Sequence, residues 1–407
     1  MALGTEGYST ALLVKIEYAG AMGSSFATAA QMLDRLGELS ISAKHVQRIT
    51  ERIGRERLRQ RQEQVEQMQA RILPPAYREP PQVAALHLDA GKIRLRADDG
   101  VPGVRRPHWA DTKVGCFQTY TSPSCEHDPQ PNPPAVFLDP PRVVRLCQEM
   151  EEIRNVPATR PTATKAELPL TCEAVIERPE RLVRTAVATR EGTEGFGWMV
   201  AAEAMRRGFY QARRRAIVGD GGNWIGPLGQ RHFPGWVQVL DFLHLLVHLY
   251  AAATVAYEHL GSRGRFCVWR LYERMLRAAW AGQVDQVQRL LRERLEHLGP
   301  PSKEPSGKDP RKVLSSVLDY VNANASRMDY ARYRREGLPV TSTLVESLIK
   351  QFNARVKGTE KFWCEAGAEA ILQSRAAYLS EDGRVEAFYA HRPRGRAAGP
   401  NRLRRSA

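Results

Sequence analysis

The sequence contains few cysteines, and no two of them form a C-x-x-C pair. Zinc ribbons are held by such pairs, so a cysteine-based zinc site is not expected. The six cysteines are widely spaced along 407 residues, which favours reduced thiols over a disulfide framework. They are Cys116, Cys125, Cys147, Cys172, Cys267 and Cys364.

Long apolar runs are also missing. No stretch approaches the roughly 20 apolar residues that a membrane-spanning helix requires. The start of the chain, MALGTEGYST, lacks the basic and then apolar pattern of a signal peptide. We therefore expect a soluble, cytoplasmic protein with no membrane partner. The sequence shows no G-x-x-x-x-G-K phosphate loop and no G-x-S-x-G turn, so neither of those enzyme classes is indicated.

Acidic residues are outnumbered by basic ones. The chain has 60 Lys and Arg against 45 Asp and Glu, which gives a formal net charge of +15. Nucleic acid is the commonest polyanionic partner of such a chain, although the charge also fits a basic protein with a polar surface. The length allows two or three domains, and the 43% hydrophobic content is ordinary for a globular protein.

Helical patterns dominate residues 8–75. Ser9 can cap a first helix, residues 26–36 form a second, and Gly37 ends it. Ser42 can cap a third, basic helix, followed by a long charged helix that ends at two prolines. Two helices around a Gly-containing turn fit a helix-turn-helix, and an ordinary helical hairpin fits equally. The candidate DNA contacts on the third helix are Lys44, Arg48 and Arg52.

The pattern then changes to short apolar strands. One strand leads to Asp89, and Ala90–Gly91 predicts a tight turn into a second strand. Residues 113–120, 216–219 and 237–240 are further strand candidates. Pro-rich loops are expected at 121–142 and 155–170. A helix over 194–214 is expected to end in a basic cluster, Arg213, Arg214 and Arg215, whose members are further candidate DNA contacts.

The second half of the chain is mostly helical. Residues 242–325 have helical patterns, interrupted by a Gly/Pro/Lys loop at 299–312. An amphipathic helix follows around 344–352, and another begins after Trp363. The C-terminal tail is Arg-rich, has no apolar periodicity, and is expected to be disordered.

Three acids stand out by position. Asp89 and Asp220 each end an apolar strand, and Glu346 lies on the polar side of the amphipathic helix. Each also has a simpler interpretation: Asp89 and Asp220 precede turn-forming residues, and Glu346 lies four residues before Lys350. Strand ends open onto one edge of a sheet, however, so acids placed there converge on one site.

Three carboxylates in one site repel each other and require divalent cations. Two such ions, about 3.5–4 Å apart, can clamp the attacking and leaving oxygens of a phosphodiester. Carboxylate ligands favour hard cations, so we expect two Mg²⁺ or Mn²⁺ ions held by Asp89, Asp220 and Glu346.

A second motif, D-F-L-H-x-x-x-H, begins at Asp241. His244 and His248 share a helix face, so a zinc site is one interpretation. The motif differs from H-E-x-x-H because no Glu follows the first His. We favour a supporting role for Asp241 and His244 beside the acids, with His248 packed in the core.

Three stretches carry a family resemblance: LHLDAGKIRLRADDG with HWADTKVGCF, then AIVGDGGNWIGPLGQRHFPGWVQVLDFLHLLVHL, then GLPVTSTLVESLIKQFNARVKGTEKFWCEAGAEAIL. With them the chain resembles a bacterial insertion-sequence transposase of the DDE type, in the Kra-type group. The resemblance spans roughly residues 9–380 and is weakest at 121–190. It implies that Asp89, Asp220 and Glu346 form the catalytic triad, with Asp241 and His244 as an accessory pair. It also implies that Arg355, Lys357 and Trp363 lie near bound DNA. Lys350, on the same helix as Glu346, is a further candidate DNA contact.

The expected fold is α/β: an RNase H-like mixed-sheet catalytic core with an all-α insertion and an N-terminal helical (helix-turn-helix) domain. The expected division is a DNA-binding region at 1–75, the first part of the core at 76–241, and the insertion at 242–325. The rest of the core follows at 326–385, and a basic tail at 386–407. The implied partner is double-stranded DNA at the transposon ends and the target, and the implied assembly is a homodimer or larger oligomer.

Two departures from the family motivate a second hypothesis. Relatives often carry a Gly-Ser-Gly turn before the last acid, where this chain has Thr341-Ser342-Thr343, and they often have additional N-terminal sequence. An inactive or repurposed DNA-binding protein derived from a transposase would fit these differences. A third hypothesis is an RNase H-like nuclease that cuts DNA without joining it.

Overall fold

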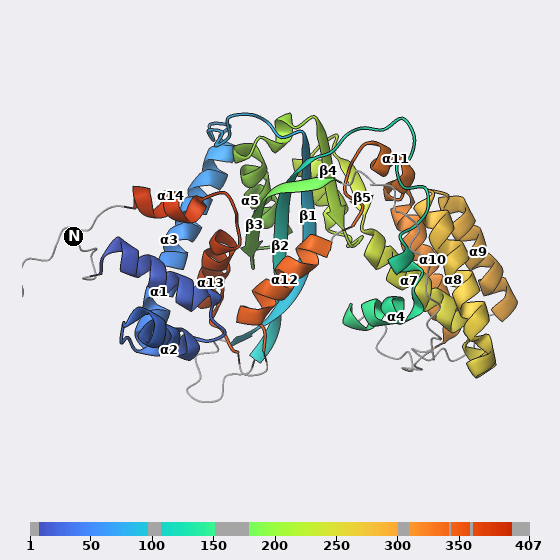
Figure 1. Ribbon diagram of the computed structural model, residues 1–407, viewed down its shortest axis with the longest axis horizontal. Helices are drawn as coiled ribbons and strands as arrows, with labels where there is room; N and C mark the ends of the chain where they lie inside the picture. Colours follow the sequence, from blue (N-terminus) through green and yellow to red (C-terminus); the bar gives the residue numbers. More distant parts are fainter. Residues whose placement is uncertain are drawn as a thin grey trace, which may run out of the picture.

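The computed structural model describes residues 8–96, 107–150, 179–299, 309–341, 343–358 and 361–392. The side chains of Pro107, Ser262, Arg263, Thr343, Leu344 and Glu346 lie outside the description. The chain forms a lobe built on a sheet, with the N-terminal helices at its side, and a second lobe made of helices (Figure 1). The predicted loop at 155–170 and most of the tail also lie outside the described residues.

A five-stranded mixed sheet forms the centre of the first lobe, in the order β3-β2-β1-β4-β5. Its strands are β1 (Val83–Arg96), β2 (Pro107–Thr121), β3 (Glu180–Thr189), β4 (Arg214–Gly219) and β5 (Val237–Leu240). β2 is antiparallel to both β1 and β3, whereas β4 is parallel to both β1 and β5. The predicted strands at 113–120, 216–219 and 237–240 are confirmed, and β3 was not predicted.

The tight turn predicted at Ala90–Gly91 is wrong, because β1 continues through it. Ala90 pairs with Lys113 and Gly91 with Thr112, so β2 holds both residues in extended backbone. A Cβ atom at Gly91 would lie 3.2 Å from Thr112 Oγ1. The glycine therefore allows a close cross-strand contact and does not mark a turn.

Helices cover both faces of the sheet. On one face α12 (Thr343–Val356) and α13 (Glu365–Tyr378) pack against β1, β2 and β3 through residues such as Ile93, Cys116 and Leu348. On the other face α5 (Thr193–Arg206) and α6 (Ile225–His232) cover Leu86, Leu88 and Ile217. The alternation of side chains along each strand therefore supplies two separate apolar layers.

The N-terminal helices are α1 (Thr10–Met22), α2 (Phe26–Gly37) and α3 (Ala43–Gln69). Ser9, Ser25 and Ser42 cap them, so the caps predicted at Ser9 and Ser42 are confirmed. The predicted third helix and the long charged helix are one continuous helix, α3, which lies against α13 and α5. A Cβ at Gly54 would lie 2.1 Å from the carbonyl oxygen of Ala370, so glycine permits this close crossing.

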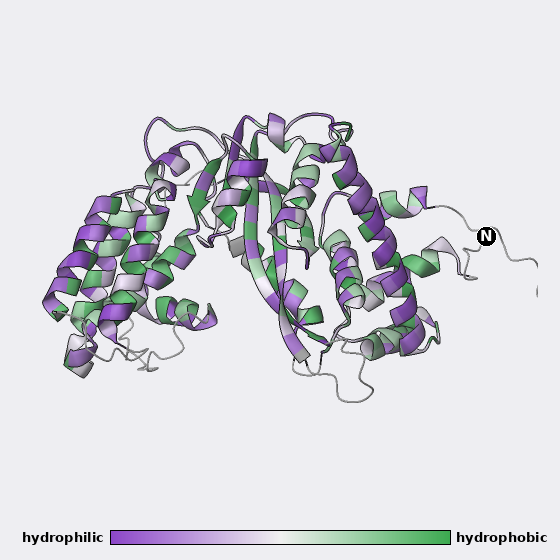
Figure 2. Ribbon diagram, turned by 180° about the vertical axis from the view of Figure 1, so that it is seen from behind, coloured by the Kyte–Doolittle hydropathy of each residue, from purple (hydrophilic) through white to green (hydrophobic). Residues whose placement is uncertain are grey.

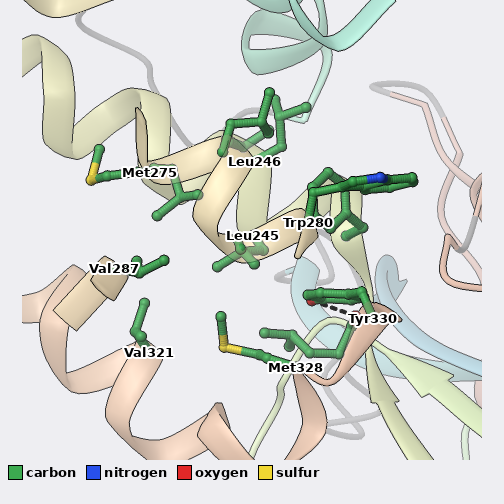
Figure 3. Packing of buried hydrophobic residues seen from close by; sticks show 14 of the residues in the cluster. Leu245, Leu246, Met275, Trp280, Val287, Val321, Met328 and Tyr330 are labelled. Carbon is green, nitrogen blue, oxygen red and sulfur yellow. Dashed lines mark hydrogen bonds between the residues drawn. The ribbon is translucent and has the colours of Figure 1, made fainter. Parts of the chain in front are cut away.

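The helical lobe contains α7 (Phe242–Ala256), α8 (Arg265–Trp280), α9 (Val284–Leu298), α10 (Pro310–Asn324) and α11 (Tyr330–Arg335). Their buried faces share one core, in which Leu245, Met275 and Trp280 meet Met328 and Tyr330 (Figure 3). The same core includes Val83 and Val239 of the sheet and reaches Leu338, so it joins the helical lobe to the sheet.

The Pro-rich segment after β2 is docked on this lobe. Trp280 donates to the carbonyl of Gln130 (2.8 Å), and Tyr272 donates to that of Phe137 (2.9 Å). Arg334 forms an ion pair with Asp128. The segment ends in α4 (Pro140–Glu149), which begins with prolines at the positions where a helix tolerates them.

The C-terminal region is more ordered than predicted as far as residue 392. Helix α14 (Arg384–His391) occupies the start of the expected tail, and Tyr389 on it is buried against Glu17 of α1. None of the helices in the described ranges has the length and apolar character needed to cross a bilayer.

Both outer strands have hydrogen-bond partners along their free edges. On β5, Tyr330 donates to the carbonyl of Leu240 and Tyr333 to that of Gln238. On β3, Ser380 accepts from the amide of Ala186, and Gln373 donates to the carbonyl of Ala188.

Candidate active site

The sheet brings three acids to one edge. Leu88 pairs with Gly219, and Gly219 pairs with Leu240, on the parallel strands β1, β4 and β5. The residues that follow them are Asp89, Asp220 and Asp241. Neighbouring strands lie about 4.8 Å apart, so the three acids stand in a row: Asp220 and Asp241 follow the ends of β4 and β5, and Asp89 lies at the same level within the longer β1.

Asp220 is held in a tight backbone arrangement. Its Oδ1 accepts a hydrogen bond from the amide of Gly222 at 2.9 Å. Gly221 has φ +86°, and a Cβ there would lie 2.9 Å from Leu240 Cδ1 and 3.0 Å from Tyr320 Cε2. Tyr320 also donates its hydroxyl to the Asp220 carbonyl at 2.8 Å. Asp220 therefore starts a turn, and the same turn leaves it at the candidate site, so the two interpretations of this residue are compatible.

Asp89 is half-buried and remains within β1. Its Oδ1 accepts from the amide of Ala90 at 2.6 Å. His87, two residues earlier on the same face, is fully buried, with its Nε2 3.3 Å from the Tyr120 hydroxyl. Burial lowers the pKa of His87 to about 4, so this imidazole is neutral at pH 7.

Asp241 is fully buried and caps α7. It accepts from the amide of His244 at 3.2 Å and contacts His244 Nδ1 at 2.6 Å. The structure thus joins the two residues predicted to support the site. Because the cap also fixes the start of α7, the pair connects the end of β5 to the helical lobe.

The zinc interpretation of His244 and His248 has no support here. The ring of His248 lies 4.0 Å from that of Tyr320, and burial lowers its pKa to about 4. Among the side chains that the structure describes, no group of three His, Cys, Asp or Glu residues is arranged to hold a metal ion. The side chain of Glu346 lies outside that set, so the predicted triad has only two described members.

The helix that carries Glu346 packs on β1 and β2 through Val345 and Leu348. Asn353 lies beside Gly91, with its Oδ1 3.9 Å from an ideal Cβ there. Farther along, Trp363 donates to the Val356 carbonyl and bridges to Leu95 at the far end of β1. Helix α12 therefore runs in the same direction as β1, and its first turn, which contains residue 346, lies toward Asp89.

The predicted DNA contacts fall into exposed and buried groups. Lys44, Arg48, Arg213, Lys350 and Lys357 are exposed. Lys350 on α12 lies 3.3 Å from Glu149 on α4, so this ion pair links the two lobes. Arg52 is half-buried and forms an ion pair with Glu56 at 3.6 Å. The exposed residues remain candidates for phosphate contacts.

Four further residues predicted near DNA make contacts within the fold. Arg355 is 2% exposed, donates to the Gly20 carbonyl at 3.0 Å, and lies between the rings of Phe26 and Trp363. Trp363 itself is 7% exposed. These two residues join α12 to the N-terminal helices, so their predicted contact with DNA is corrected to a packing role.

Arg214 and Arg215 are the other two. Arg214 donates to the carbonyls of Ser122 and Glu336, and Arg215 donates to that of Tyr210. Both lie at the start of β4, one strand length of about 20 Å from Asp220. Only Arg213 of the predicted basic cluster is exposed, and the cluster starts a strand where a helix end was predicted.

Sequence reasoning missed Tyr320, Tyr330 and Tyr333. These tyrosines come from the end of the helical segment and donate to carbonyls of Asp220 and of β5. Their separations in sequence from the residues they contact are 100, 90 and 95. No local pattern links such distant positions, so only the fold identifies them.

Comparison with known proteins adds no relative: no protein-family model matches the sequence, and no curated protein matches it. The function is therefore inferred from the arrangement of the acids, the sheet and the helices around them.

Proposed function

We propose that this chain is a DDE-type DNA transposase with an RNase H-like core, which cuts DNA at transposon ends and joins the freed strand to target DNA. The strand order β3-β2-β1-β4-β5 and its directions agree with an RNase H-like sheet. Helices α7 to α10 lie between β5 and the helix with Glu346, as the family resemblance implies for the insertion.

One observation carries the proposal: Asp89 and Asp220 follow paired residues on adjacent parallel strands. Two carboxylates at such a spacing repel each other in the absence of a cation. Asp220 commits Oδ1 to the Gly222 amide, which leaves Oδ2 to act as a ligand. Oxygen donors of this kind suit Mg²⁺ or Mn²⁺, so the described acids fit the implied ions.

Asp89, Asp220 and Glu346 would hold two divalent ions, which supply charge neutralisation and activation of the attacking hydroxyl in phosphoryl transfer. The surrounding residues fix the position of the acids. Tyr320 and the Gly221 backbone hold the Asp220 turn, and the Asp241–His244 cap holds the neighbouring strand end.

Double-stranded DNA is the proposed partner, in keeping with the net charge of +15. Exposed basic residues on the sheet lobe and its N-terminal helices would supply phosphate contacts: Lys44, Arg48, Arg213, Lys350 and Lys357. A transposon has two ends, which must be processed together, so the active species is proposed to be a homodimer or larger assembly.

The test is a plasmid transposition assay in cells, with a marker flanked by the DNA that borders the gene. Wild type is compared with Asp220→Asn and with Asp285→Asn, a control at an exposed position in α9. Transposition by wild type and the control alone supports the proposal. Normal transposition by Asp220→Asn would contradict the assignment of the acids.

Purified protein separates the remaining alternatives. Labelled end DNA with Mg²⁺ should give both cleaved strands and products joined to a target plasmid. Metal-dependent nicks without joined products would favour a nuclease. DNA binding that divalent ions do not change, with no cleavage, would favour a repurposed DNA-binding protein.

A further inference from the structure

The far ends of β1 and β2 form a two-stranded ribbon, and among the described residues helices cover it on one face only. Ile93 and Leu95 point toward α12 and Trp363 and are fully buried. On the opposite face, the layer beneath α5 and α6 ends at Leu88 on β1. Beyond it, Lys92 and Arg96 are exposed, and Figure 2 views this uncovered side of the two strands.

The side chains on this uncovered face are mostly basic. Lys92, Arg94 and Arg96 alternate along β1, and Lys113 lies on β2. The acid paired with Lys92 is Asp111, at 4.0 Å, and both side chains are about two-thirds exposed, with 68% and 67% relative accessibility. An exposed ion pair of this kind contributes little to the stability of the fold, so stabilisation does not explain why this face carries charged side chains.

Trp109 lies opposite Arg94 on the same face. Its exposed fraction is 55%, whereas Trp236, Trp280 and Trp363 are buried. The Arg94 guanidinium lies 5.7 Å from the Trp109 ring centre and 4.6 Å from that of Phe362. Arg94 therefore supports an indole ring whose surface remains open to solvent.

An exposed indole between cations fits one kind of ligand better than others. Lys and Arg contact phosphates of nucleic acid, and an aromatic ring stacks on a base. The bases of an intact duplex already stack on each other, so Trp109 can take only an unpaired or terminal base. Ala90, which follows Asp89 in β1, is the first residue of this face beyond Leu88, so a strand bound there runs along the part of β1 that carries Asp89.

We propose that the uncovered face of the β1–β2 ribbon binds a single-stranded segment of DNA, with Trp109 stacked on an unpaired base and the exposed Lys92 and Arg96 on its phosphates. This inference deepens the proposed function, on which it rests for the identity of the nucleic acid. It predicts a preference for DNA with a single-stranded overhang over the same duplex with a blunt end.

The experiment measures fluorescence anisotropy of labelled DNA in EDTA, so that no cleavage occurs and the acids are not tested. The first two probes are a blunt duplex and the same duplex with an overhang of about six nucleotides, a length that matches the number of nucleotides one single-strand site binds. The third probe is an RNA with the sequence of the overhang. Wild type is compared with Trp109→Leu, Trp109→Phe and Lys92→Glu. The matched controls are Phe266→Leu, an aromatic 73% exposed on α8, and Lys312→Glu on α10.

Trp109→Leu should weaken overhang binding about tenfold and blunt-duplex binding much less, as expected for loss of one stacked base. Trp109→Phe should retain most of the affinity, and Lys92→Glu should weaken binding more at low salt than at high salt. The controls should bind as wild type. Equal loss with both probes, or no loss, would overturn the proposal. Stronger binding to the RNA than to the overhang DNA would also overturn it. The same holds if Trp109→Leu changes the oligomeric state and leaves DNA binding unchanged.

These outcomes are independent of those for the proposed function. Asp220→Asn should bind the overhang probe as wild type does while failing to transpose. If it transposes normally and the overhang preference persists, the catalytic assignment fails and the ribbon proposal survives.

Discussion

Asp89 and Asp220 stand side by side because the residues before them, Leu88 and Gly219, pair on adjacent parallel strands. Two carboxylates held this close destabilise each other, and a divalent cation bound between them relieves the repulsion. The proposed binding of divalent ions by this pair can therefore be tested without a DNA substrate.

Replacement of Asp89 by asparagine should therefore change two properties. Cleavage of labelled end DNA should fall more than about a hundredfold. Mg²⁺ should raise the melting temperature of wild type, because it binds the folded state, and should raise that of Asp89→Asn much less. Differential scanning fluorimetry across a magnesium titration checks this, and an equal shift in both proteins would show that Asp89 is not a ligand.

Gly221 should not tolerate a side chain. Its φ of +86° and the three neighbours within about 3 Å of an added Cβ predict that Gly221→Ala loses about 3 kcal/mol of unfolding free energy. Gly37→Ala is the control, because nothing lies within 4 Å of a Cβ there. At that helix position alanine should be neutral or stabilise by about 0.5–1 kcal/mol. Urea unfolding of both variants measures the difference, and a neutral Gly221→Ala would mean that the turn after Asp220 is not constrained.

Arg355 should contribute to stability and Lys357 to DNA binding. Arg355→Gln removes a buried group that lies between two aromatic rings and bonds to Gly20, so about 2–3 kcal/mol of unfolding free energy should be lost. Lys357→Gln, at an exposed position two residues later, should leave stability unchanged and weaken DNA binding. Chemical unfolding and a DNA titration on each variant make the comparison. The reverse pattern would restore Arg355 as a DNA contact.

His87 should make the fold sensitive to acid. Its pKa is lowered from 6.5 to about 4 in the folded chain, so between these values the unfolded chain binds a proton that the folded chain does not. Stability from this side chain is complete above pH 6.5 and is lost as pH falls toward 4, by about 3 kcal/mol in total. His87→Gln should flatten that part of the stability profile, whereas His259→Gln, at an exposed position, should not. Unfolding free energies measured from pH 7.5 to 4 give the profile, and parallel curves for wild type and His87→Gln would contradict the assignment.

The parts of the fold that could be predicted were those encoded locally. β4 and β5 are short apolar runs that end in Asp220 and Asp241, and the serine caps mark helix starts. The error at Ala90–Gly91 arose because a glycine pattern that suits a turn also suits a tight strand pair. The choice between them depends on β2, whose extent is not visible from residues 89–92.

The candidate site was predicted in part for a similar reason. Register placed Asp89 beside Asp220 once β1 and β4 were known to be parallel, and the motif itself marked Asp241 and His244. Burial could not be predicted from the motifs. Arg355 and Lys357 belong to the same short sequence, yet one packs against Trp363 and the other faces solvent.

The outer strands of the sheet have a consequence for how copies of this chain can meet. Tyr330 and Tyr333 occupy carbonyls on the free side of β5, and Ser380 and Gln373 occupy backbone groups on that of β3. A strand from another molecule would have to displace these bonds before it could pair there. Within the described part of the chain, a continuous intermolecular sheet is therefore disfavoured at both ends. The proposed assembly around two DNA ends would therefore use surfaces other than these two strand edges, or the DNA itself.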